Sequence, residues 1–132
     1  MPPTSFEQLA VGHEFPPTSY QLTESVISRY VEAVGGQQDF LKSGIVPPLA
    51  IAAYAMDALA KSFSVPPGSI HASQELEFLK VVPIGTTISC GGKVAQKVER
   101  GRLNLIVLEI NAINQDKEKV LTGKATIAIP QM

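Results

Sequence analysis

Apolar side chains cover nearly every side of the segment from Leu49 to Phe63, whose strongly polar residues are Asp57, Lys61 and Ser62. A helix that is apolar on nearly every side has to be buried on nearly every side. Pro47-Pro48 suits the start of such a helix, because proline lacks an N–H that would have no partner in the first turn. The pattern therefore predicts one central buried helix over residues 49–63.

A second helix is predicted ahead of the central one. Between Glu24 and Val34 the apolar residues recur every three or four positions, which is the spacing of an amphipathic helix. Thr23 is placed to cap its amino end with its hydroxyl, and Gly35-Gly36 to end it. Residues 37–46 are predicted to form a loop.

Strands dominate the rest of the chain. Alternating apolar and polar residues predict a strand at 69–80, and further strands are predicted at 86–98, 102–114 and 120–129. The strand at 102–114 has Leu, Ile and Val on both faces, which is typical of a central strand. Before the first helix, Pro16-Pro17 fit a short strand at the edge of a sheet. The order of elements predicts a single α+β domain over residues 1–132, in which an antiparallel sheet wraps around the central helix.

Two details of the strands bear on function. Strict alternation along 69–80 places His71 on the more polar face, together with Ser73 and Glu75. Gly91-Gly92, in the middle of the strand at 86–98, predicts a bulge or a sharp bend.

Composition excludes several classes of partner. Eleven basic and twelve acidic residues give a net charge of −1, and no basic stripe follows any element, so we expect no nucleic-acid binding. No apolar run is long enough to span a bilayer and no secretory signal opens the chain, so we expect no membrane partner and a cytoplasmic location.

Cys90 is the single cysteine and is interpreted as a buried apolar residue. With 45% hydrophobic and 17% charged residues, the chain is apolar enough to predict an oligomer interface.

Six short motifs occur in an informative order. They are Phe6-Glu7-Gln8-Leu9 with Val11-Gly12-His13-Glu14-Phe15, the helix from Leu22-Thr23-Glu24 through Tyr30 and Ala33, Gly44-Ile45-Val46-Pro47-Pro48, His71 through Phe78, Val82-Pro83-Ile84-Gly85, and Leu121-Thr122-Gly123-Lys124-Ala125-Thr126. They are spread from Phe6 to Thr126, and in this order they resemble the MaoC-like hydratase/dehydratases, more closely the amino-terminal type of half of those enzymes. The resemblance covers nearly the whole chain.

The resemblance implies a hotdog fold and an acyl thioester of coenzyme A or acyl carrier protein as the molecule bound, with no separate cofactor. It also implies that two hotdog domains pair, so that two sheets continue into one, either as a homodimer or with a different hotdog subunit. In the family, an aspartate and a histidine in the loop before the central helix activate a water molecule. They belong to the pattern Gly-Asp-x-Asn-Pro-x-His.

This sequence departs from that pattern at the decisive place. After Gly36 the chain has Gln37 where the aspartate is expected, and Asp39-Phe40 where Asn-Pro is expected. A glutamine cannot act as a general base at neutral pH. The only histidines are His13 and His71, and neither lies in the loop.

The candidate catalytic residues are therefore Asp39 and His71. Asp39 is the only carboxylate in the loop and is interpreted as a solvated turn residue, a displaced catalytic group or a group that faces substrate. His71 is interpreted as a hydrogen-bonded structural residue or as a residue of the cleft near the thioester. His13 and His71 lack the spacing of metal ligands, so no metal site is expected.

The candidate substrate-binding residues lie at and within the central helix. Gly44, Val46, Pro47 and Pro48 shape the approach to it, and the first-turn N–H groups beyond them could polarise a thioester carbonyl. Tyr54 and Asp57 follow within the helix. Asp57 is interpreted either as part of an interface ion pair or a wet helix end, or as the carboxylate of a thioesterase.

These observations leave three functions open. The first is a hydratase or dehydratase of (R)-3-hydroxyacyl and enoyl thioesters, in which this chain is the substrate-binding subunit and a second chain supplies the Asp and His. The second is a non-catalytic acyl-thioester binding module. The third is a thioesterase that uses Asp57 or Asp39.

Overall fold

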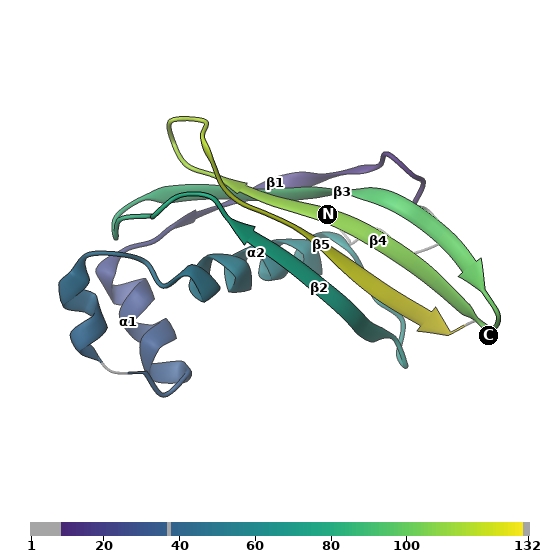
Figure 1. Ribbon diagram of the computed structural model, residues 1–132, viewed down its shortest axis with the longest axis horizontal. Coiled ribbons are helices and arrows are strands. Elements are labelled where there is room, and N and C mark those ends of the chain that lie inside the picture. Colours follow the sequence, from purple (N-terminus) through teal and green to yellow (C-terminus); the bar gives the residue numbers. More distant parts are fainter. Residues whose placement is uncertain (1–8, 37, 131–132) are drawn as a thin grey trace.

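A curved five-stranded antiparallel sheet lies over one long helix in the computed structural model, which describes residues 9–36 and 38–130 (Figure 1). The strands are β1 (Glu14–Gln21), β2 (Ile70–Phe78), β3 (Thr87–Arg100), β4 (Leu103–Ile113) and β5 (Lys119–Pro130). The helices are α1 (Glu24–Ala33), the 3-10 helix η2 (Gln38–Ser43) and the long helix α2 (Pro48–Ser62). This arrangement confirms the predicted α+β hotdog architecture.

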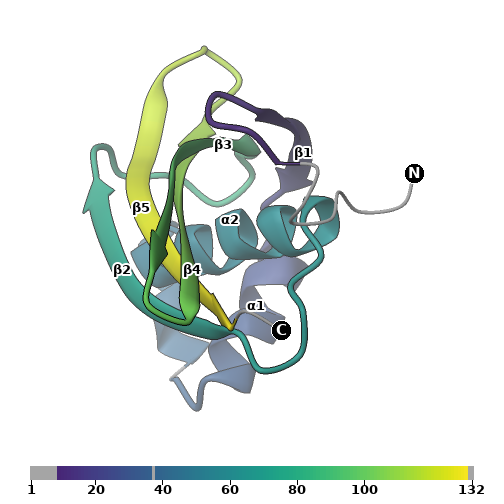
Figure 2. The same cartoon turned by 90° about the vertical axis from the view of Figure 1, so that its right-hand side faces the viewer.

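Helix α2 packs on the sheet through small side chains. Ala52, Ala55 and Ala58 are buried together with Ile51 and Leu59, so the helix backbone comes close to the strands. The side of α2 that faces away from the sheet is open, and Leu49 is 63% exposed there. The prediction that this helix is buried on nearly every side is therefore wrong for the single chain, because the sheet covers only one side of it (Figure 2).

Helix α1 forms as its sequence predicts. The Thr23 hydroxyl accepts a hydrogen bond from the Val26 N–H at 3.2 Å, which satisfies one of the free donors of the first turn. Ile27 and Val31 are buried on its inner side. Residues 38–43, predicted as loop, form η2 instead, because the periodicity of so short a helix is too brief to stand out in the sequence.

The order of strands across the sheet is β1-β3-β4-β5-β2. Strand β2 pairs with β5, so the connection between β2 and β3 crosses from one side of the sheet to the other rather than making a hairpin. An isolated bridge between Ile45 and Pro83 holds this crossing connection against the segment that leads into α2. Strands β1 and β2 are the two edges of the sheet.

The sheet has an inner face toward α2 and an outer face away from it. Directly paired residues share a face, so the pairing register assigns each side chain. The inner face carries most of the core, with fully buried residues such as Val94, Ile106, Leu108 and Ala125. The outer face carries most of the charged side chains of the strands.

The irregularity predicted at Gly91-Gly92 occurs in the pairing with β1: Gly92 pairs with Phe15 and Cys90 with Thr18, so β1 has one extra residue opposite Gly91. Toward β4 the two glycines pair regularly, with Asn111 and Ile110. The register shift between β3 and β4 lies instead between Val94 and Gln96. What Gly92 provides is room: a Cβ atom added there would lie 2.4 Å from the Glu109 carbonyl oxygen.

Candidate functional site

An apolar cavity of about 280 Å³ lies between the carboxyl-terminal half of α2 and the inner face of the sheet. From α2 and the residues just after it, the lining includes Met56, Leu59, Ala60 and Phe63. Leu108 of β4 and Ile127 of β5 form the opposite wall. Its size is close to the lower end of the range for ligand sites, and apolar walls are typical of them.

His71 lines this cavity, on the face of the sheet opposite to the predicted one. The register between β2 and β5 shifts between His71 and Ser73, so that His71 pairs with Ile127 while Ser73 pairs with Thr126. Ala72 is the extra residue of this irregularity, and it breaks the alternation. His71 therefore lies on the inner face, whereas Ser73 and Glu75 lie on the outer face. The placement brings an imidazole ring to the wall of an apolar cavity, and the role of His71 there stays a prediction.

The approach to α2 is held by backbone hydrogen bonds. The Val46 N–H donates to the Val82 carbonyl at 2.7 Å, and the Ile84 N–H donates to the Gly44 carbonyl at 2.8 Å. Gly44 has φ 73°, a left-handed conformation that favours glycine. The Val46 side chain is buried, so Gly44 and Val46 position the amino end of α2 rather than form an open surface.

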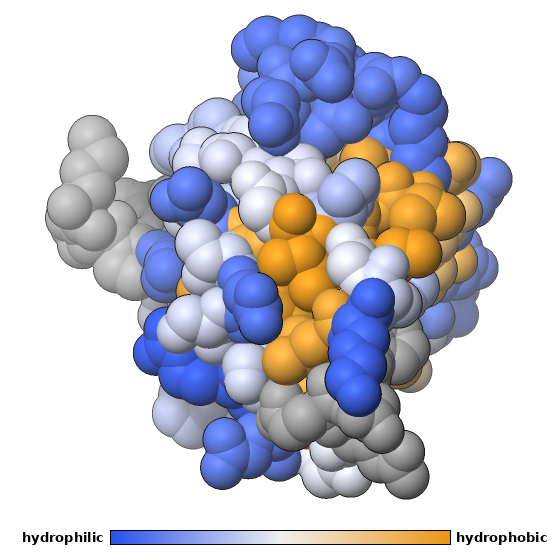
Figure 3. Space-filling model, turned by 90° about the vertical axis from the view of Figure 1, so that its left-hand side faces the viewer, coloured by the Kyte–Doolittle hydropathy of each residue, from blue (hydrophilic) through white to orange (hydrophobic). Residues whose placement is uncertain are grey.

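Pro47 and Pro48 line a second apolar pocket, of about 260 Å³, between the end of α1 and the start of α2. Val34 and Leu49 also line it, and both are more than 60% exposed. Figure 3 shows the apolar patch at this end of the molecule. The helix begins beside it at Pro47, with no side chain capping its amino end.

Tyr54 and Asp57 lie on another side of α2 and line neither pocket. The Tyr20 hydroxyl donates to Asp57 Oδ2 at 2.6 Å, and Lys61 Nζ lies 3.0 Å from the same oxygen. The Tyr20 and Tyr54 rings pack 4.9 Å apart. The cluster fastens α2 to the edge strand β1.

The charges of this cluster oppose a role for Asp57 as a base. The hydrogen bond from Tyr20 and the contact with Lys61 lower the pKa of Asp57, which makes its carboxylate a weaker proton acceptor at neutral pH. Burial, followed by the hydrogen bond to Asp57, raises the pKa of Tyr20. Burial also raises the pKa of the Cys90 thiol to about 12, so Cys90 stays protonated. These directions favour an ion pair over a thioesterase carboxylate, and the pair is with Lys61 of the same helix rather than across an interface.

We expect Tyr20→Phe to destabilise the protein by roughly 0.5–1 kcal/mol at pH 7, because a half-exposed carboxylate loses one charge-assisted hydrogen bond. The folded-state pKa of Asp57 is below its ordinary value of 3.8, so the stability it contributes is present above that pH and is lost below it. Chemical denaturation of wild type and variant at pH 7 and pH 3 measures the effect. A difference that is as large at pH 3 as at pH 7 would show that the Asp57 charge is not involved.

The remaining predicted site residue, Asp39, lies within η2 rather than in a loop. Gln37 is outside the described residues, and Asp39 is described only through its backbone, at the start of η2. The amino-terminal motif piece Phe6-Glu7-Gln8 is also outside them. The roles proposed for Asp39 therefore stay predictions.

Sequence reasoning missed most of the residues that form the apolar cavity beneath α2. Met56, Phe63, Leu108 and Ile127 are ordinary apolar residues in core positions, and nothing in their type or spacing marks a cavity. Only the packing of α2 against the sheet brings them together.

A hotdog sheet that covers one side of a long helix, with an apolar cavity between them, defines the class of protein. Residues 9–123 match the family described as "FAS1-like, dehydratase domain region", and the chain belongs to this family of MaoC-like hotdog proteins. Among curated proteins, none matches the sequence significantly.

Solved structures of hydratases and dehydratases share the fold. The (R)-hydratase PhaJ1 from Pseudomonas aeruginosa is 19% identical with a TM-score of 0.77, over 96% of this chain and 85% of that one. A MaoC-like dehydratase from Rhodospirillum rubrum is 17% identical with a TM-score of 0.75, over 96% and 97%. A chain of the ChsH1-ChsH2 complex from Mycobacterium tuberculosis is 15% identical with a TM-score of 0.72, over 91% and 98%.

Proposed function

We propose that this protein binds an acyl thioester of coenzyme A or acyl carrier protein and is the substrate-binding subunit of an (R)-specific enoyl hydratase/3-hydroxyacyl dehydratase. The observation that carries the proposal is the apolar cavity beneath α2 with His71 at its wall. Walls of aliphatic and aromatic side chains suit an acyl chain, and a volume of about 280 Å³ favours a short one.

The chemistry of hydration needs groups that this chain lacks in the expected place. Addition of water to an enoyl thioester requires a base that takes a proton from water and an acid that protonates carbon. Gln37 cannot supply the first function. We infer that a second hotdog subunit supplies the Asp and His. One of the similar solved structures is likewise a chain of a complex of two proteins, ChsH1-ChsH2.

The decisive experiment measures crotonyl-CoA hydration by the purified chain, followed by the absorbance of the conjugated thioester, alongside binding of the same thioester by calorimetry. We expect saturable binding without turnover, because binding needs only the cavity whereas hydration needs the missing acid–base pair. Turnover by the isolated chain would contradict the subunit role, and Asp39 and His71 would then be the first residues to mutate. Absence of binding would contradict acyl-thioester recognition itself.

The cavity can be tested separately by adding volume at its wall. Ala60→Leu places a larger side chain in the cavity from an exposed helix position, where leucine suits the helix. We expect the affinity for acyl-CoA to fall at least about tenfold, or roughly 1.4 kcal/mol of binding free energy. Ala53→Leu, on an exposed position of the same helix outside the cavity, is the matched control and should bind as wild type. If the two variants bind acyl-CoA with equal affinity, the acyl group does not occupy this cavity.

A further inference from the structure

Two polar side chains interrupt the apolar wall of the cavity beneath α2. Of the described residues that line it, Ser69 and His71 have side chains that form hydrogen bonds, and the others are aliphatic, aromatic or methionine. Both polar residues lie where the chain returns from the carboxyl end of α2 and enters β2. The cavity is therefore apolar over most of its surface and polar beside the start of β2.

The Ser69 hydroxyl is held in place by the loop that follows α2. Its Oγ donates to the Pro66 carbonyl at 2.6 Å, and the Ser69 N–H donates to the same oxygen at 3.2 Å. A serine hydroxyl has one proton and two lone pairs. Because the proton is used within the loop, Ser69 offers the cavity a hydrogen-bond acceptor and no donor.

His71 supplies the complementary group. One residue separates it from Ser69, and both line the same cavity, so their backbones are roughly 6–7 Å apart along the strand. A neutral imidazole donates from one ring nitrogen and accepts at the other. A ligand hydroxyl that lies between the two side chains can therefore donate to Ser69 Oγ and accept from the His71 N–H.

The cavity does not suit a charged end group. An ionised carboxylate has only lone pairs, which would face the lone pairs of Ser69. No lysine, arginine, aspartate or glutamate is among the described residues that line the cavity. A carboxylate or an ammonium group would therefore lose its water without gaining a counter-ion, which is costly.

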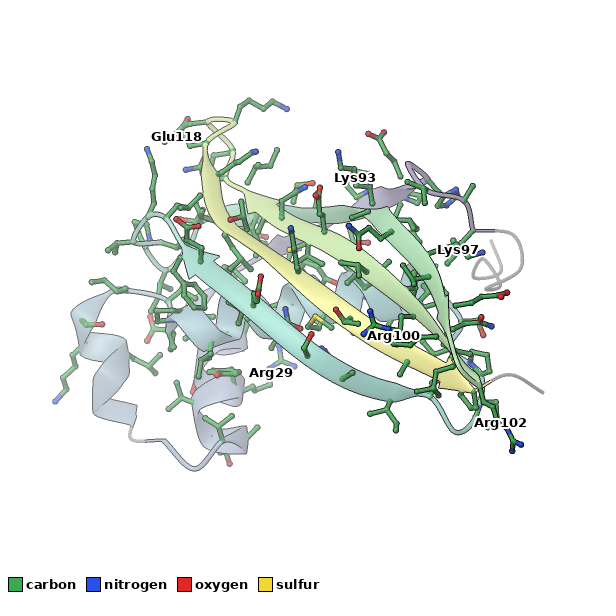
Figure 4. All side chains as sticks on the ribbon, turned by 45° about the vertical axis from the view of Figure 1, so that its right-hand side comes forward. Arg29, Lys93, Lys97, Arg100, Arg102 and Glu118 are labelled. Carbon is green, nitrogen blue, oxygen red and sulfur yellow. The ribbon has the colours of Figure 1, made fainter. Side chains whose placement is uncertain are left out.

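The nearest labelled cation does not change this conclusion. Gly68 lies beside Pro130, and Pro130 pairs with Leu103, so Arg102 belongs to the same end of the sheet as the cavity's polar residues. Figure 4 shows the Arg102 side chain extending away from the strands. An uncharged hydroxyl is the polar group that fits.

This hydroxyl differs from the one at C3 of the acyl group. In the proposed function, the catalytic pair of the second subunit adds or removes the C3 oxygen, so the proton of that oxygen passes to and from the pair. The hydroxyl in the cavity has to donate its proton to Ser69 instead. It is therefore a second oxygen, further along the acyl chain.

We propose that the cavity selects acyl thioesters whose chain carries a hydroxyl group at its far end, and that this group donates to Ser69 and accepts from His71. The proposal rests on the proposed function and names the class of acyl group. The apolar walls hold the methylene groups, and a cavity of about 280 Å³ brings the end of a short chain to the start of β2. An analogue without the hydroxyl leaves both polar side chains without a partner in the complex, which lowers its affinity.

The test compares three thioesters by calorimetric binding to the wild-type protein: hexanoyl-CoA, 3-hydroxyhexanoyl-CoA and 6-hydroxyhexanoyl-CoA. We expect 6-hydroxyhexanoyl-CoA to bind at least about tenfold more tightly than hexanoyl-CoA, because it forms two further hydrogen bonds. We expect 3-hydroxyhexanoyl-CoA to bind within about threefold of hexanoyl-CoA, since its hydroxyl does not reach Ser69 and each hydrogen bond alone has a modest net effect.

Variants assign the preference to the two side chains. Ser69→Ala removes the acceptor and His71→Leu removes the donor, and each should reduce the preference for 6-hydroxyhexanoyl-CoA to within about twofold. His71→Gln keeps an N–H donor and should retain most of the preference. Ser73→Ala, at an exposed position on the outer face of β2, is the matched control and should keep the wild-type preference. Because the preference is a ratio measured on one variant, a modest loss of stability does not change it.

Equal affinities of the wild type for hexanoyl-CoA and 6-hydroxyhexanoyl-CoA would overturn the proposal. A gain with 3-hydroxyhexanoyl-CoA alone would also overturn it, as would a preference that survives both Ser69→Ala and His71→Leu. Failure of the proposed function gives a different result, because none of the three thioesters would then bind.

Discussion

Gly92→Ala is expected to destabilise the protein by about 3 kcal/mol, at the upper end of the range for overpacking. The new Cβ would lie 2.4 Å from the Glu109 carbonyl oxygen and 3.4 Å from Leu59 Cδ2. The first of these is a backbone atom of the neighbouring strand, which cannot move without disturbing its pairing. Glycine at this point lets β3 and β4 pack closely beneath α2.

Thermal and chemical denaturation measure this effect, with an expected fall in melting temperature of about 10 °C. Gly91→Ala is the matched control, since its Cβ would meet Pro17 at 3.7 Å, an ordinary contact. Both residues are glycines of the same strand, so their backbone entropies in the unfolded chain are alike. Equal destabilisation by the two substitutions would refute the packing explanation.

Leu108→Ala is expected to cost about 2–5 kcal/mol of stability and to enlarge the cavity beneath α2 at the same time. Leu108 is 2% exposed and forms part of the wall opposite the helix. Removing most of its side chain adds volume where we place the acyl group. The variant should therefore lose stability while its preference among acyl thioesters shifts toward longer chains.

Calorimetric binding of a series of acyl-CoA thioesters at a temperature where the variant is folded tests the second effect. Leu105→Ala, on the outer face of the same strand, is the control for truncation outside the cavity. We expect it to lose about 1 kcal/mol of stability, because Leu105 is only half-buried, and to keep the wild-type order of thioesters. If the Leu108→Ala variant keeps the wild-type order of preference among acyl thioesters, the acyl group does not contact this wall.

Much of the fold follows from local patterns in the sequence. The central helix was predicted at 49–63 and forms at Pro48–Ser62, because two prolines and an apolar run mark it clearly. The strand predicted at 120–129 forms at Lys119–Pro130, because the polar turn before it and Pro130 after it mark its two ends. The Thr23 cap is likewise a short-range property, and it forms as predicted.

Long-range features were beyond the same reasoning. No local pattern states that β2 pairs with β5, since strand order depends on which surfaces fit together across the whole sheet. Nor does alternation reveal the irregularity at Ala72, so the sequence placed His71 on the wrong face. A single extra residue in a strand reverses the face of everything on one side of it.

In the candidate site too, local features follow from the sequence and long-range features do not. Its backbone supports, such as Gly44, could be read from turn chemistry, whereas its walls could not. Tyr20 gave no functional signal in the sequence because its partner Asp57 is 37 positions away. The open side of α2 was also missed. The apolar character of a helix indicates that its surface is covered, but not whether the same chain or another chain covers it.

The prolines of β1 have a consequence for the size of any assembly. A sheet whose two edges both accept strands can elongate indefinitely, as fibrils do. Here Pro16 and Pro17 make one edge a terminus. Each copy of the chain can then join only one neighbour through its backbone, so growth stops after a single addition.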